Sequence, residues 1–182
     1  MAKAVRFVVA MLMLVLAGSA FAAGSAHDYR FTAIEGGDLP MSSFKGKAVL
    51  VVNTASQCGY TLQYKDLESL WKRYRDRGLV VLAVPSNDFG GQEPGTEKEI
   101  KQFCEVTFGI DFPMTSKEKV IGAGAHPFYA WAEKELGAEA VPKWNFHKYL
   151  VGTDGRLIRA FPTKTSPGNP ELIKAVEAAL PK

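Results

Sequence analysis

The chain has 182 residues, of which 47% are hydrophobic and 23% are charged, and its formal charge is +3. This length suits one domain with a sizeable core rather than two domains. Lysines and arginines are scattered, often beside acids, and removing Lys3 and Arg6 with the first residues lowers the formal charge to +1. We therefore expect no nucleic acid partner.

The first residues predict an export signal. Lys3 and Arg6 give a basic start, residues 7–16 form an apolar run, and residues 20–22 make a small-x-small cleavage site. A membrane anchor is the alternative, but the run is well short of the roughly 20 apolar residues that span a bilayer. We expect cleavage after Ala22, a mature domain of residues 23–182 in the bacterial periplasm, and no stable membrane association after cleavage.

The first half of the mature chain predicts a hairpin followed by a strand, a helix and a second strand. Residues 29–44 alternate between apolar and polar around a Gly-Gly turn, whereas residues 48–53 and 79–84 are continuous apolar runs typical of strands buried on both faces. Apolar residues at helical spacing lie between the two runs, and Gly78 ends that helix. The loops that follow two parallel strands share one sheet edge, so we expect them to converge.

The second half predicts three helices and a strand pair. Thr96 and Glu99 form a capping box for a helix that ends at Gly109, and Asn169-Pro170 begins the last helix. The other expected elements are a helix at 127–136 and antiparallel strands at 144–151 and 156–161. The order predicts a single α/β domain with a thioredoxin-like fold, in which helices flank a central mixed sheet and a hairpin comes first.

Cys58 is the strongest candidate for a reactive residue. It follows the first buried strand where the chain turns into a helix, and backbone N–H groups at a helix start favour the thiolate. No second cysteine lies three residues on, so the chain lacks the C-x-x-C motif of dithiol exchangers. The only other cysteine, Cys104, is 46 positions later in the predicted helix after residue 96.

Three interpretations of Cys104 are open. It could condense with an oxidised Cys58 before further oxidation traps that sulfur, or it could be a small hydrophobic core residue. An exported protein could also hold a structural Cys58–Cys104 bridge, which the chain-entropy model values at roughly 4 kcal/mol. The third interpretation predicts that both cysteines matter for stability alone.

Gln92, Trp144 and Asn145 are candidate hydrogen-bond donors to the Cys58 sulfur. Their amide and indole N–H groups are uncharged, so they stabilise an anionic sulfur without neutralising it. Each also has a plainer interpretation, because a loop glutamine commonly faces water and a tryptophan that begins a strand commonly packs in the core. The sequence does not decide whether the three side chains meet.

Three segments resemble the signature segments of the glutathione peroxidase family. They are Val-Asn-Thr-Ala-Ser-Gln-Cys-Gly-Tyr-Thr at 52–61, Asn-Asp-Phe-Gly-Gly-Gln-Glu-Pro-Gly at 87–95 and Trp-Asn-Phe-His-Lys-Tyr-Leu-Val at 144–151. The resemblance implies that Cys58 is the peroxidatic residue and that Gln92, Trp144 and Asn145 complete a catalytic tetrad. Cys104, in Lys-Gln-Phe-Cys-Glu-Val-Thr-Phe-Gly, matches the resolving cysteine of the two-cysteine branch, whose members typically use thioredoxin-type reductants.

The chain departs from the family pattern at Ser86, Asp88 and Leu62. Ser86 replaces a third cysteine, and Leu62 replaces a frequent proline near the start of the helix. Asp88 would raise the pKa of Cys58 if it pointed inward and would be harmless if it capped the turn. The connection between residues 120 and 144 lacks the long insertion of tetrameric members, which implies a monomer or weak dimer.

The sequence therefore predicts an exported thiol peroxidase that reduces hydrogen peroxide or organic hydroperoxides, with a thioredoxin-like protein or glutathione as reductant. No metal, flavin or nucleotide cofactor is expected, since sulfur carries the redox change and the three histidines show no metal-site spacing and suit surface or capping roles. The alternatives are a thiol oxidase or peroxide sensor that passes its disulfide to other exported proteins, and a binding domain with a structural disulfide. If Cys104 resolves, one helix must move to let the sulfurs meet.

Overall fold

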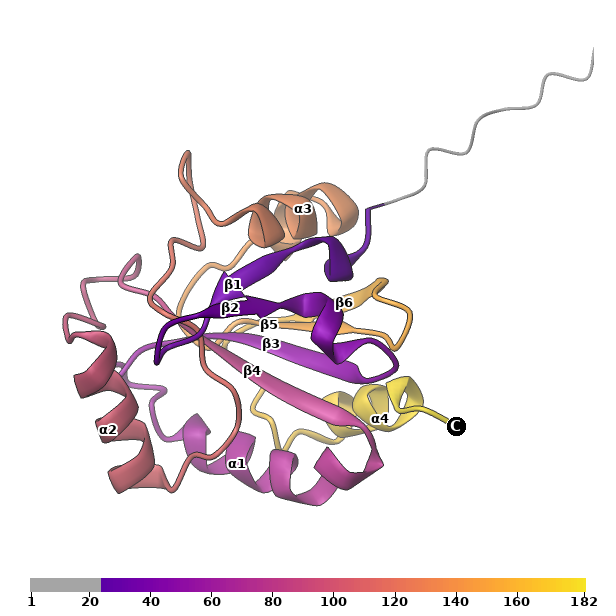
Figure 1. Cartoon of the computed structure of the whole chain (residues 1–182), viewed down its shortest axis with the longest axis horizontal. Helices are drawn as coiled ribbons and strands as arrows, with labels where there is room; N and C mark the ends of the chain where they lie inside the picture. Colours follow the sequence, from indigo (N-terminus) through magenta and orange to yellow (C-terminus); the bar gives the residue numbers. More distant parts are fainter. Residues whose placement is uncertain (1–23) are drawn as a thin grey trace, which may run out of the picture.

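The computed structural model describes residues 24–182, and the predicted signal at residues 1–22 lies outside this range. A four-stranded sheet of order β4-β3-β5-β6 runs through the centre (Figure 1). β3 (Ala48–Thr54) pairs in parallel with β4 (Leu79–Pro85) and antiparallel with β5 (Lys148–Val151), which in turn pairs antiparallel with β6 (Leu157–Phe161). This is the mixed sheet that the sequence predicts.

Every residue of β3 and β4 is buried, which explains their continuous apolar runs. Successive side chains of a strand point to opposite faces, so each strand contributes to two separate apolar clusters. One cluster takes Leu50 and Val52 and packs against α1, α2 and α4. The other takes Val49 and Val51 and packs against α3 and the N-terminal hairpin.

The helices agree with the sequence predictions. α1 (Gln63–Tyr74) is extended by a short 3₁₀ turn and stops at Gly78, whose φ of 91° lies in the left-handed region. α2 (Glu97–Phe108) starts with the Thr96–Glu99 capping box. α3 (Pro127–Leu136) and α4 (Pro170–Ala179) both begin with proline, and the Asn169 side chain caps the second of these.

The predicted N-terminal hairpin is also present. β1 (Arg30–Thr32) and β2 (Asp38–Pro40) pair antiparallel in a separate two-stranded sheet. In Figure 1 this hairpin and α3 lie on one side of the central sheet, whereas α1 and α4 lie on the other. The candidate residues Cys58 and Gln92 follow the ends of β3 and β4, at one edge of the sheet.

One predicted strand starts later than the sequence suggests. β5 begins at Lys148 rather than at Trp144, because Phe146 has a φ of 60° and a left-handed residue cannot continue an extended strand. The Phe146 N–H donates to the Asn53 carbonyl at 2.6 Å, which fixes this unusual backbone against the end of β3. Trp144 and Asn145 consequently lie in a loop, where their side chains are not committed to the sheet.

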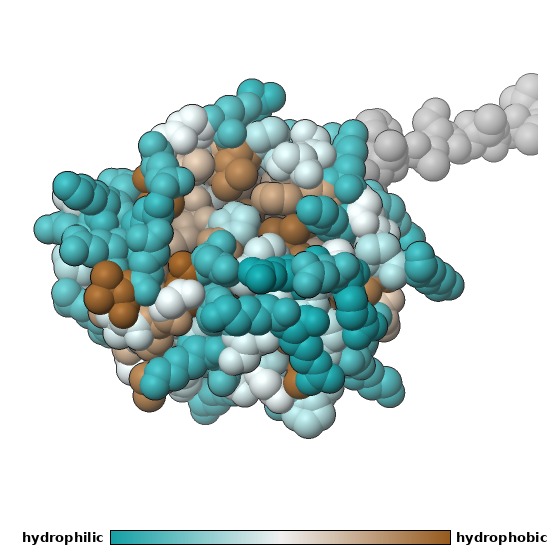
Figure 2. Space-filling view, turned by 60° about the horizontal axis from the view of Figure 1, so that its bottom comes forward, coloured by the Kyte–Doolittle hydropathy of each residue, from teal (hydrophilic) through white to brown (hydrophobic). Residues whose placement is uncertain are grey.

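One face of the molecule is mostly polar (Figure 2). Figure 2 shows one face on which hydrophilic side chains dominate and hydrophobic residues gather only in small groups. Within residues 24–182 the exposed large hydrophobic side chains are Leu62, Val106, Trp144 and Ile158. Among residues 24–182 no helix combines the length and the apolar character that a membrane crossing requires.

Candidate active site

Cys58 lies in a series of turns between β3 and α1. Its side chain is buried, with 8% of the residue exposed, and the Tyr60 N–H donates to its Sγ at 3.4 Å. α1 begins only at Gln63, so the sulfur meets an N–H of the preceding turn rather than the first turn of the helix itself. The Thr61 hydroxyl accepts the Cys58 N–H at 3.0 Å and fixes the turn that carries the thiol.

The loop that follows β4 does converge on the Cys58 loop. The Gln57 N–H donates to the Gln92 carbonyl at 3.0 Å, so the residues before Cys58 are tied directly to Gln92. Asn145 Nδ2 also donates to Gln92 Oε1 at 3.0 Å. Because the amide oxygen of Gln92 is occupied by Asn145, its NH₂ group remains available as a donor.

Asn145 is fully buried and is held through its backbone. The Thr163 hydroxyl donates to the Asn145 carbonyl at 2.7 Å, and Asn53 Nδ2 donates to the Trp144 carbonyl at 3.2 Å. Asn53 and Thr163 are not among the site residues predicted from the sequence. Asn53 carried a signal, since it is a polar residue inside a buried apolar strand, whereas Thr163 carried none.

Trp144 is the exposed member of the group. It is 38% exposed, and its ring packs against Phe89 of the β4 loop with centroids 5.8 Å apart. The loops that carry Cys58, Gln92, Trp144 and Asn145 thus meet at one sheet edge. Within residues 24–182, no side-chain hydrogen bond joins the Cys58 sulfur to the other three residues.

Cys104 is fully buried on α2, and both cysteines are free thiols. The two residues belong to the same apolar cluster. Burial raises the pKa of the Cys104 thiol to about 11, and the neighbouring Tyr64 hydroxyl opposes this rise by favouring the thiolate. The Cys104 thiol is therefore protonated at neutral pH and must lose a proton before it can act as a nucleophile.

The Asp88 carboxylate is held by backbone hydrogen bonds. Its Oδ2 accepts the backbone N–H groups of Val120 and Ile121 at 2.6 and 3.2 Å. The carboxylate therefore anchors the segment that leads to α3. The structure supports the harmless of the two roles that the sequence left open for Asp88.

One histidine lies where the sequence predicts and another does not. His126 caps α3 by accepting the Phe128 N–H at 3.2 Å. His147 was expected at the surface or at a cap, but it is buried, and burial lowers its pKa to about 4. It directly follows the left-handed Phe146. Residues 24–182 contain no group of three His, Cys, Asp or Glu side chains that could hold a metal ion.

A cavity of about 390 Å³ adjoins Trp144 and Tyr60. Its lining is mainly apolar and includes Val141, Ala160 and Pro162, together with Lys143, Lys164 and His147. An apolar hollow next to the Cys58 turn offers space for a substrate larger than hydrogen peroxide.

Comparison with known proteins identifies the group of enzymes to which this site belongs. The sequence signature of glutathione peroxidase matches residues 26–133. The chain belongs to the glutathione peroxidase family. It is therefore a peroxidase of EC class 1.11.1, and the three motifs identified in the sequence lead to the same assignment.

Relatives within the family cover most of the chain. The glutathione peroxidase-like peroxiredoxin gpx1 of Schizosaccharomyces pombe is 46% identical over 136 residues, which are 73% of this chain and 85% of the relative. The hydroperoxy fatty acid reductase gpx1 of Synechocystis is 39% identical over 157 residues, covering 82% of this chain and 93% of the relative. These relatives support thiol peroxidase activity.

Solved structures support the fold. A crystal structure of T. cruzi GPX1 superposes with a TM-score of 0.68 at 30% identity and covers 86% of this chain and 96% of the other. A thioredoxin-family thiol:disulfide interchange protein from Chlorobium tepidum superposes with a TM-score of 0.61 at 17% identity, covering 83% of this chain and 92% of the other. The predicted thioredoxin-like fold is confirmed.

Proposed function

We propose that this member of the family reduces hydrogen peroxide and organic hydroperoxides through Cys58. The Cys58 thiolate attacks one peroxide oxygen, the O–O bond breaks, and Cys58 becomes a sulfenic acid while the other oxygen leaves and is protonated to water or an alcohol. The observation that carries the proposal is the convergence of the Cys58 and Gln92 loops through the Gln57–Gln92 backbone bond. No metal or organic cofactor takes part in this sequence of steps.

Gln92, Trp144 and Asn145 stabilise the charge that develops. Asn145 orients the Gln92 amide so that its NH₂ group is free to donate, and the Trp144 indole supplies a second neutral donor at the same edge. Neutral donors stabilise both a thiolate and a departing alkoxide, and removing one such donor costs roughly 100-fold in rate in comparable sites. Substrate binding brings these donors into hydrogen-bond contact with the reacting atoms.

Cys104 resolves the sulfenic acid. Its thiol attacks the Cys58 sulfur, the S–O bond breaks, and a disulfide and water form. Both thiols are free in this structure, so we expect α2 to shift or unwind locally when the sulfurs bond. A thioredoxin-like protein or glutathione then supplies two electrons and two protons that regenerate both thiols.

The cavity beside Trp144 suits an organic hydroperoxide. Its apolar walls fit an alkyl chain, and Lys143 and Lys164 are placed to attract an anionic group on the same molecule. A relative at 39% identity is called a hydroperoxy fatty acid reductase, which is consistent with such a substrate.

We further propose that the protein acts as a monomer or weak dimer in the periplasm after cleavage behind Ala22. Recovery of a periplasmic chain that begins at Ala23 tests the location, and sedimentation of that chain tests the oligomeric state.

Mass spectrometry after one equivalent of peroxide tests the chemistry. We expect a Cys58–Cys104 disulfide in the wild type and a trappable Cys58 sulfenic acid in Cys104→Ser. If neither species forms, the proposed roles are wrong. Loss of activity in Cys58→Ser with an unchanged melting temperature would exclude a merely structural disulfide.

Turnover assays then identify the reductant. Peroxide consumption is measured with a thioredoxin system, with glutathione and its reductase, and with a reduced unfolded protein as electron donor. We expect sustained turnover with the thioredoxin system. Rapid oxidation of the unfolded protein, with slow turnover on both the thioredoxin system and glutathione, would favour the thiol oxidase alternative.

A further inference from the structure

Glu93 is a buried acid that the mechanism above does not use. It follows Gln92 in the β4 loop and is fully buried, yet neither carboxyl oxygen has a hydrogen-bond partner among residues 24–182. Carboxyl groups in such surroundings are costly, so an unpartnered one usually has a functional reason. Its backbone is firmly placed, because its N–H donates to Asn87 Oδ1 at 2.8 Å and Lys117 Nζ donates to its carbonyl at 3.3 Å.

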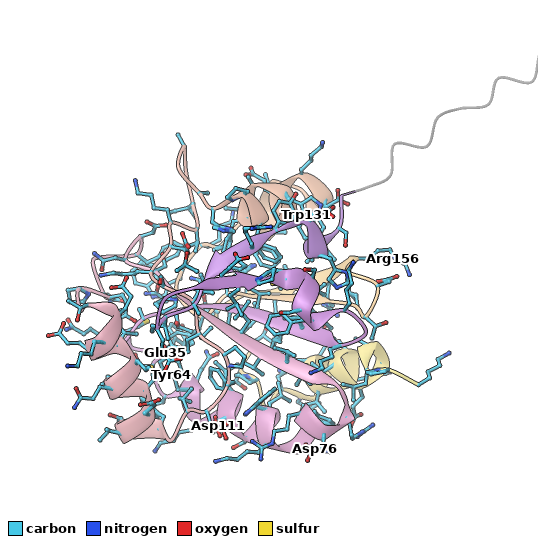
Figure 3. All side chains as sticks on the ribbon, viewed as in Figure 1. Glu35, Tyr64, Asp76, Asp111, Trp131 and Arg156 are labelled. Carbon is cyan, nitrogen blue, oxygen red and sulfur yellow. The ribbon has the colours of Figure 1, made fainter. Side chains whose placement is uncertain are left out.

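Glu93 lies between the two cysteine-bearing segments, because it lines one cavity together with Ser56 of the Cys58 loop and Phe103 of α2. On one side it faces the Ser56 amide and hydroxyl, outside hydrogen-bond geometry, two residues before Cys58. On the other side its charge opposes ionisation of Cys104 on α2 and of Tyr64 on α1. Figure 3 shows Tyr64 between α1 and α2. Tyr64 and Cys104 belong to the same apolar cluster.

The resolving step needs a proton acceptor at this place. The Cys104 thiol is protonated at neutral pH, whereas attack on the Cys58 sulfur requires a thiolate. The Tyr64 hydroxyl can donate a hydrogen bond to the thiolate once it forms, but it is too weak a base to remove the proton. Lys117, the nearby cation, directs its Nζ to the Glu93 and Gly95 carbonyl oxygens rather than to the thiol.

We infer that Glu93 is the proton acceptor for Cys104 in the resolving step and that Tyr64 stabilises the resulting thiolate. The Glu93 carboxylate takes the thiol proton, Cys104 attacks the Cys58 sulfur, and the S–O bond breaks. The departing hydroxide takes the proton back from Glu93, so the products are a disulfide and water and the carboxylate is restored. This inference rests on the proposed resolving role of Cys104.

The test is single-turnover disulfide formation in Glu93→Gln, which preserves the shape of the side chain. Cys58 is first oxidised with one equivalent of peroxide, and the disulfide is then followed by quenching and mass spectrometry. We expect the rate to fall roughly 100-fold at neutral pH, as is usual when a general base is removed. In Tyr64→Phe we expect a smaller loss, because the thiolate loses a hydrogen bond but not its base.

Glu105→Gln is the matched control. Glu105 neighbours Cys104 on the exposed side of α2, and its charge also opposes ionisation of the thiol. Removing this charge without removing a base should leave the rate within about twofold of the wild type. If disulfide formation in Glu93→Gln is as fast as in Glu105→Gln or faster, then the charge of Glu93 only opposes ionisation of the Cys104 thiol. That result would overturn the inference.

Chemical rescue separates a proton acceptor from a structural residue. A cavity of about 420 Å³, lined by Ser56, Glu93, Ile100 and Phe103 among others, adjoins the carboxyl. In Glu93→Ala, acetate or formate should enter this cavity and restore disulfide formation in proportion to its concentration. No rescue in a folded variant would contradict the inference. If the wild type itself formed no disulfide, the proposed role of Cys104 would fail instead.

Discussion

Replacing Lys148 with methionine should change how the stability of the protein depends on pH. Lys148 is fully buried in β5, and its Nζ donates to Gln63 Oε1 at 2.6 Å and to the Thr165 carbonyl at 2.6 Å. Among residues 24–182 it forms no ion pair within 4 Å. Burial therefore lowers the pKa of the Lys148 ammonium from 10.5 to about 7.

The sign of the effect follows from proton binding. Between pH 7 and 10.5 the unfolded chain keeps the Lys148 proton, whereas the native state has released it, so this residue makes the native state more stable as pH rises. The free energy of unfolding should rise by up to about 1.4 kcal/mol per pH unit in this window. Lys148→Met lacks this contribution, and methionine has a similar length without a charge to bury.

Urea unfolding followed by tryptophan fluorescence measures the difference. We expect the free energy of unfolding of the wild type, relative to Lys148→Met, to increase by about 2 kcal/mol between pH 7.5 and 9. Titration of the cysteines cancels in this comparison, since both proteins contain them. A difference that stays constant over this range would refute the reasoning and would mean that the Gln63 and Thr165 oxygen atoms keep the ammonium charged in the native state.

Four further predictions concern single side chains. Because burial lowers the pKa of His147 to about 4, the wild type should lose roughly 3 kcal/mol of unfolding free energy relative to His147→Gln as pH falls from 6.5 to 4, measured by urea unfolding. Asp88→Ala should cost about 2 kcal/mol in the same assay and leave the peroxide reaction rate of Cys58 nearly unchanged; a large loss of rate would contradict the anchoring role. Thr163→Val should slow that reaction several-fold in stopped-flow measurements, since it releases the Asn145 carbonyl. Gly155→Ala should lower the melting temperature, because its φ is 81° and a Cβ would meet the Ser25 hydroxyl, and an unchanged melting temperature would count against this close packing.

The sheet, the helices and the family could all be predicted from the amino-acid sequence. Short apolar runs rich in valine and bounded by turn residues are typical of strands buried on both faces, and residues 48–54 and 79–85 form such strands. Capping residues such as Thr96 and Asn169 bind backbone N–H groups within one turn, so the starts of α2 and α4 could also be predicted. The three signature segments likewise carried the family, because motif order and spacing survive in the sequence.

The contacts within the candidate site join residues that are far apart in the chain, so they could not be predicted from the sequence. The left-handed Phe146 ends the predicted strand early and frees Asn145 to orient Gln92, and this depends on a bond to Asn53, about ninety residues away. The burial of Glu93 and Lys148 was hidden for the same reason, since charged residues in a loop and a strand look solvated until distant elements close over them. Both cysteines could be singled out from the sequence, but the burial of the Glu93 carboxyl group between their segments could not.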